Sequence, residues 1–118
     1  MTIRDLLNRL LETRDQIHYW HLQTSSYSEH KALQSFYEQW IDLADQYIES
    51  YQGVGEKANG IINIQLMPYT PNCASEYLKK CLIYVNVDAR TISDTNLSAI
   101  LDEMGILIRQ TLFLLTLK

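Results

Sequence analysis

The first part of the chain alternates apolar and polar residues with a helical period. Between residues 2 and 23, apolar side chains recur at intervals of three and four residues, with one histidine in the same stripe: Ile3, Leu6, Leu7, Leu10, Ile17 and His21. This spacing is typical of one face of an amphipathic helix. Thr2 can cap the start, and Asp5 lies in the first turn, where the macrodipole favours a carboxylate. The pattern therefore predicts a helix over residues 2–23.

A second, broader apolar face follows a polar break at residues 24–28. It predicts a helix over residues 29–52, with Ser28 as the N-cap and Glu29 in the first turn. We expect this helix to end at residues 53–55, where a glycine can adopt the left-handed conformation. Because only a short link joins the two predicted helices, they should lie antiparallel.

Residues 54–72 lack a helical period. The run from 61 to 67 alternates loosely like a strand, and Pro68 and Pro71 close it. A single strand leaves its backbone donors and acceptors without partners. We therefore expect an extended, partly buried crossover, and a strand paired with residues 82–87 is the alternative that the pattern leaves open.

The helical period returns after residue 72. The apolar positions of this third helix are Tyr77, Leu78, Cys81, Leu82, Val85 and Ala89. A break at residues 91–94 supplies a capping residue, and a fourth helix then runs to the C-terminus, interrupted only by Gly105. The sequence therefore predicts an all-α, antiparallel four-helix bundle with an irregular crossover between helices two and three, forming one domain over residues 1–118.

Composition and charge narrow the classes of partner. The chain has 118 residues, 14 acidic against 10 basic, and a formal charge of −4. This charge and the lack of any Lys/Arg run argue against a nucleic-acid partner. No apolar run approaches the ~20 residues of a membrane span, and the N-terminus has no apolar signal region. We therefore expect a cytoplasmic protein, in the host cytoplasm if it is virus-encoded, with Cys73 and Cys81 as free thiols.

Several polar residues beside the apolar faces are candidate metal ligands. His30, Gln34, Glu38, Asp45 and Glu49 follow one edge of the second helix, and His18 and His21 lie at the border and middle of the first helix's stripe. Imidazoles and carboxylates that converge in a bundle are the ligand set of iron or manganese sites. Two plainer interpretations stay open: the acids form a solvated helix face, and His21 is a hydrogen-bonded core residue.

The segment HLQTSSYSEHKAL at residues 21–33, followed by Tyr37, Asp45, Glu49 and Gly53, resembles the first helical hairpin of the Dps-like ferritins. It is also similar to short, uncharacterised ferritin-like proteins of tailed bacteriophages. In Dps, one histidine ends helix one and a second begins helix two. An aspartate follows the second histidine by four residues, and an Asp and a Glu follow it by fifteen and nineteen.

Applied to this chain, the resemblance makes His30 the second histidine and His21 the first, with His18 as the other choice. The offsets fall on Gln34, Asp45 and Glu49, so a glutamine replaces the first anionic ligand. The resemblance implies a homo-oligomer, at least a dimer, that binds and oxidises Fe(II) at the dimer interface, with histidines from one subunit and acids from its mate. The metal-ligand candidates are His18, His21, His30, Glu38, Asp45 and Glu49.

The cofactor implied is iron or a similar divalent metal, and the enzyme class is a ferroxidase-type oxidoreductase. The substitution at Gln34 and the abundant tyrosines and tryptophans motivate an alternative function. In that alternative, the chain is a non-enzymatic, phage-encoded helical protein that binds and modulates a host protein.

Overall fold

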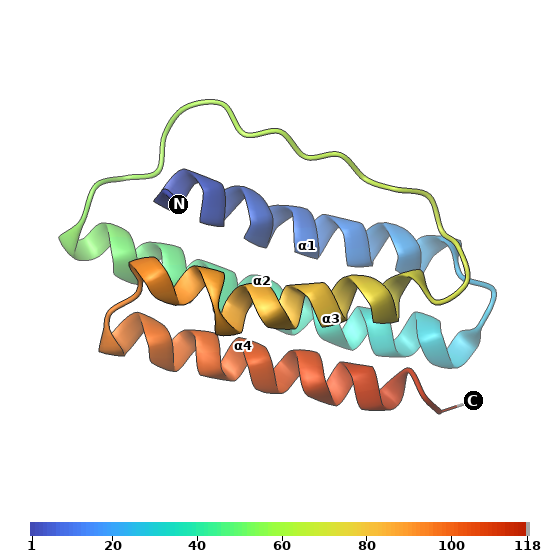
Figure 1. Ribbon diagram of the computed structural model, residues 1–118. Coiled ribbons are helices and arrows are strands. Elements are labelled where there is room, and N and C mark those ends of the chain that lie inside the picture. Colours follow the sequence, from blue (N-terminus) through green and yellow to red (C-terminus); the bar gives the residue numbers. More distant parts are fainter. Residues whose placement is uncertain (118) are drawn as a thin grey trace.

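The computed structural model describes residues 1–117, which form a bundle of four α-helices (Figure 1). The helices are α1 (Ile3–Gln23), α2 (Tyr27–Val54), α3 (Cys73–Asn86) and α4 (Thr95–Leu114), and a short 3-10 helix, η1 (Asp88–Ile92), joins the last two. The predicted all-α four-helix fold with a long connection after the second helix is thereby confirmed.

The long connection sets the direction of the second half of the chain. Figure 1 shows α1 and α2 running in opposite directions, as predicted from their short link. Residues 55–72 then return along the length of the bundle, so α3 runs in the same direction as α2, and α4 runs back. Such a topology, with one long crossover, is that of ferritin-like bundles.

The core lies between the apolar faces of all four helices. Its largest fully buried side chains include Trp40, Tyr47 and Phe36 of α2. The indole nitrogen of Trp40 donates to the backbone oxygen of Leu10 at 3.0 Å, so the most buried indole also has its polar atom satisfied. Tight packing of this kind fixes the rotation of α2 against α1 and decides which of its residues face outward.

The helix ends partly match the predictions. Thr2 and Asp5 form a reciprocal capping box at the start of α1, as expected. Helix α2 begins two residues earlier than predicted, because Ser26 rather than Ser28 accepts the capping bond from the amide of Glu29. The predicted left-handed glycine after α2 is wrong as well, since Gly55 is extended with φ −123°.

The crossover is extended and has no strand partner among the described residues, so the predicted crossover is confirmed and the strand alternative is wrong. Polar side chains of α1 replace the partner strand. Gln16 donates to the backbone oxygen of Met67 at 3.0 Å and accepts from its amide at 2.7 Å, as a neighbouring strand would. Asn8 accepts from the amide of Asn63, and Gln23 from that of Tyr69.

The third predicted helix is shorter than its apolar pattern indicated. Helix α3 ends at Asn86, and Ala89 is buried within η1 instead. Asp94 caps α4 through the amide of Leu97, as the break at residues 91–94 predicted. Cys73 and Cys81 are both free and buried, which confirms the prediction of free thiols.

Across the described part of the chain, none of the helices combines the length and apolar character that a membrane crossing needs.

Candidate functional site

Two of the predicted metal ligands meet at one end of the bundle. His21 lies in the last turn of α1, and His30 in the first turns of α2, so the short α1–α2 link brings them together. Their rings stack with centroids 3.7 Å apart and planes 17° apart. His21 is buried, with 6% of its surface exposed, and His30 is half-buried. This is the predicted first histidine joined to the predicted second.

The two histidines hold each other through backbone carbonyls. Nδ1 of His21 lies 2.7 Å from the backbone oxygen of His30, and Nδ1 of His30 lies 2.8 Å from the backbone oxygen of His21. A carbonyl oxygen can only accept, so each Nδ1 must carry the proton. In a neutral imidazole, Nε2 is then the atom with the free lone pair. A histidine that ligates a metal is oriented in this way by its second nitrogen.

The stacked geometry limits how the pair can bind metal. The lone pair of Nε2 lies in the plane of its own ring, and the two planes are nearly parallel and 3.7 Å apart at their centroids. Two such lone pairs do not converge on one ion at the ~2.1 Å of a metal–imidazole bond. The arrangement therefore suits two neighbouring ions, or one ion held by a single histidine.

His18 and two tyrosines surround this pair. The His18 ring is exposed and stacks on Tyr37 at 4.4 Å, and Tyr37 meets His21 edge-on at 5.3 Å. Tyr27 lies over His30 at 6.5 Å. Sequence analysis did not assign Tyr27 and Tyr37 to the site, although their spacing of three and seven residues from His30 places them on the same face of α2.

The predicted acidic ligands lie elsewhere on the same chain. Glu38, Asp45 and Glu49 are exposed along the outer face of α2. Asp45 and Glu49 follow His30 by 15 and 19 residues, which on a helix corresponds to about 22 Å and about 28 Å. Gln34, at the place of the missing anionic ligand, donates to Glu38 at 3.0 Å. Within residues 1–117 of a single chain, no three His, Cys, Asp or Glu side chains gather as a metal site.

The face that carries these acids also has apolar character. Leu7 and Leu11 of α1 and Ile41 of α2 are half-buried and do not belong to the core cluster. Their spacing puts them on the same sides of their helices as His18 and Asp45. Half-buried apolar side chains outside the core therefore share helix faces with His18 and Asp45.

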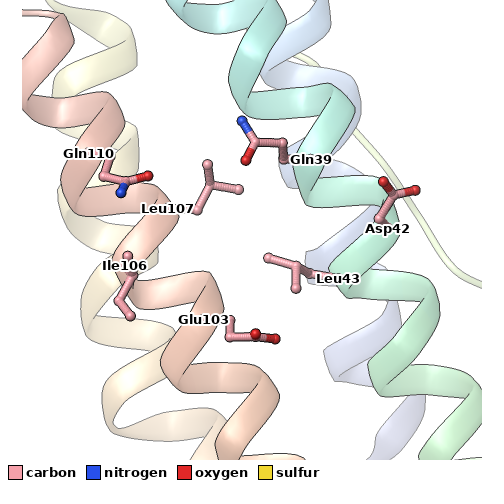
Figure 2. A pocket seen from close by; sticks show the side chains of 7 residues that line it. All are labelled: Gln39, Asp42, Leu43, Glu103, Ile106, Leu107 and Gln110. Carbon is pink, nitrogen blue, oxygen red and sulfur yellow. The ribbon is translucent and has the colours of Figure 1, made fainter.

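A groove beside α2 holds no imidazole or thiol. It has a volume of about 390 Å³ and lies between α2 and α4 (Figure 2). Leu43 and Leu107 point toward each other across it, and Asp42 and Glu103 lie on opposite walls. With two carboxylates and no other ionisable group in its lining, this groove is a weaker candidate for chemistry than the histidine pair.

The fold and the stacked histidines define a four-helix-bundle protein with two oriented imidazole donors at one end. The chain belongs to a protein family of unknown function, DUF5856, whose model matches residues 21–115. The matched region includes every predicted ligand except His18. No ferritin family matches, so the resemblance to the Dps-like ferritins rests on the quoted residues alone. No curated protein and no solved structure matches the chain.

Proposed function

We propose that this protein binds iron at a site completed by a second copy of the chain and oxidises Fe(II) there. His21 and His30 of one copy each supply an imidazole to one of two neighbouring iron ions, and Asp45 and Glu49 of the other copy supply the carboxylates. The observation that carries the proposal is the pair of Nδ1 hydrogen bonds to backbone oxygens, at 2.7 and 2.8 Å, which orient both rings and free both Nε2 atoms.

The proposal requires α2 to pair with itself in an antiparallel manner. If His30 faces the region between Asp45 and Glu49 of the second copy, the two-fold axis passes near Glu38. Both copies then present the exposed acids of α2 to each other, and Lys31 is the exposed cation on this helix. Like charges this close oppose association. Bound cations offset the repulsion, so we expect pairing through α2 to depend on the metal.

The proposed ligands are of the types that bind iron in proteins. Imidazole nitrogens with one or two carboxylates are typical ligands of non-haem iron. In the described chain neither Asp45 nor Glu49 has a salt-bridge partner, so both carboxylates are free to bind. Each Fe(II) transfers one electron to oxygen or peroxide, and the hard carboxylate oxygens stabilise the Fe(III) product. No protein side chain needs to act as a nucleophile.

The first experiment is an anaerobic titration with Fe(II), followed by oxygen. We expect saturable binding, a rise of native mass above that of the metal-free protein, and a ferric absorbance after oxygen. His30→Ala and the double variant D45N/E49Q should each lose all three signals. Asp42→Asn, an exposed acid on the same helix outside the proposed site, should keep them.

A mixing experiment tests whether the site is shared. Chains carrying His30→Ala and chains carrying D45N/E49Q each lack one half of every site. Only a mixed dimer has a complete site, and it has one of the two, so an equal mixture should regain about a quarter of the wild-type iron binding if pairing is random and about half if the metal selects mixed dimers. A site contained within one chain would regain nothing.

A second candidate function rests on a different observation. Leu22 and Tyr27 flank the α1–α2 link and are 67% and 76% exposed. Exposed apolar and aromatic side chains at one place favour a protein partner, as in the alternative of a host-binding module. A photo-crosslinking residue at position 22 should then give one discrete adduct in cells, which Tyr27→Asp removes. If iron binding fails and this adduct forms, the alternative holds.

A further inference from the structure

Helix α4 presents an exposed apolar stripe away from the bundle. Ile106 is 56% exposed and Phe113 is 63% exposed, seven residues further on. Ala99, seven residues before Ile106, is also exposed. Seven residues are two helical turns, so all three side chains lie on one line along the helix. Leu114, 40% exposed, lines a hollow together with Phe113 and extends the patch at its end.

Charged and polar residues flank this stripe in a fixed order. By helical spacing, Asp102 and Arg109 lie on one flank and Glu103 and Gln110 on the other, and all four are exposed. One oxygen of Asp102 binds Arg90 at 2.8 Å, yet 66% of its side chain stays exposed. Arg109 has no ion pair within residues 1–117. The acids Asp102 and Glu103 precede Ile106 along the helix and the base Arg109 follows it, so the charges of this face are complementary to those of a second copy placed antiparallel.

We propose that α4 pairs with α4 of a second copy, antiparallel, about a two-fold axis that passes through Ile106. In this register Ile106 meets its own equivalent, because it lies on the axis. Ala99 faces Phe113 of the second copy, since each is seven residues from the axis. Asp102 then lies beside Arg109 of the second copy.

Steric fit and charge both favour this register over a shifted one. The small Ala99 leaves room for the phenyl ring opposite it, as a hole receives a knob. Hollows flank Ile106 on both sides, the groove of about 390 Å³ between α2 and α4 (Figure 2) and another of about 250 Å³ between α3 and α4. These hollows can receive side chains from the facing helix. A shift of one turn sets Phe113 against Asp102 or Glu103 in one direction, and against the polar Asn96 or Thr95 in the other.

The proposed contact is separate from the iron site. It uses the outer face of α4, whereas the iron proposal uses the outer face of α2, and it needs no metal to offset repulsion. A chain with two different self-complementary faces can assemble beyond a dimer. Failure of one contact therefore leaves the other testable.

Disulfide cross-linking tests the axis directly. A cysteine on a two-fold axis meets its own equivalent, so Ile106→Cys should give a covalent dimer under mild oxidation. Ile83→Cys on α3 is the matched control, because it replaces an isoleucine of similar exposure, 62%, away from the axis. The native thiols are both buried and should not interfere. Equal cross-linking of the two variants would overturn the proposal.

The register has its own test. Mixed Ala99→Cys and Phe113→Cys chains should form a mixed covalent dimer, whereas each variant alone should not. Arg109→Glu should weaken metal-free association by about ten-fold, since it puts like charges together twice in each symmetric dimer, and Arg109→Lys should preserve it. A metal-free wild-type protein that is monomeric at tens of micromolar would refute the contact.

Discussion

Replacing Gln16 with methionine should loosen the crossover at Met67, where Trp20 still donates to the Met67 carbonyl oxygen at 2.9 Å. Gln16 is 1% exposed, and its amide makes two hydrogen bonds to the backbone of Met67. Methionine has nearly the same volume and shape, so it adds little cavity cost but removes both bonds. Each bond contributes roughly 0.5–1.5 kcal/mol, and the amide of Met67 loses its only partner. We therefore expect the free energy of unfolding to fall by about 2–3 kcal/mol.

Equilibrium denaturation in urea measures this loss, and hydrogen exchange locates it. The midpoint should fall with an unchanged slope, and the amide of Met67 should lose protection before the core amides do. Gln39→Met is the matched control, because the Gln39 amide bonds only within its own helix, to Ser35. It should change stability by less than about 0.5 kcal/mol. A Gln16→Met variant as stable as this control would refute the view that α1 side chains replace a partner strand.

Three further outcomes follow from local features. Ser26→Ala should lower the free energy of unfolding by about 1 kcal/mol and Ser28→Ala by much less, because only Ser26 caps α2. Urea denaturation of the two variants measures the difference. Burial raises the pKa of the Cys81 thiol to about 11. As the pH rises, the thiol ionises in the unfolded chain before it does in the folded protein, so the free energy of unfolding should fall from about pH 9 upward. The fall should be smaller in Cys81→Ala. Alkylation of Cys81 at pH 9 should require unfolding. Tyr47→Phe removes a hydroxyl that bonds Ser93 at 2.8 Å, and a melting temperature lowered by a few degrees should report the loss.

Half of the candidate site follows from local sequence and half does not. His30 follows His21 by nine positions with one short link between them, and two helices joined so closely must bring these side chains near each other. The periodic pattern also put His21 on the buried face, where it lies. The proposed role of Asp45 and Glu49 does not follow from local sequence, because they lie far along α2 from the histidines of their own chain and the proposal needs a second copy to bring them there.

The periodicity and capping residues of the chain by themselves determined the four helices, their approximate ends and the all-α class, since those depend on neighbours three or four positions away. Tertiary structure alone decided how the crossover is held, because its backbone partners come from α1, 51 residues earlier in the case of Gln16 and Met67. It also decided the reciprocal bonding of His21 and His30. Their donors and acceptors belong to different helices, and only the packed bundle brings them within 3 Å.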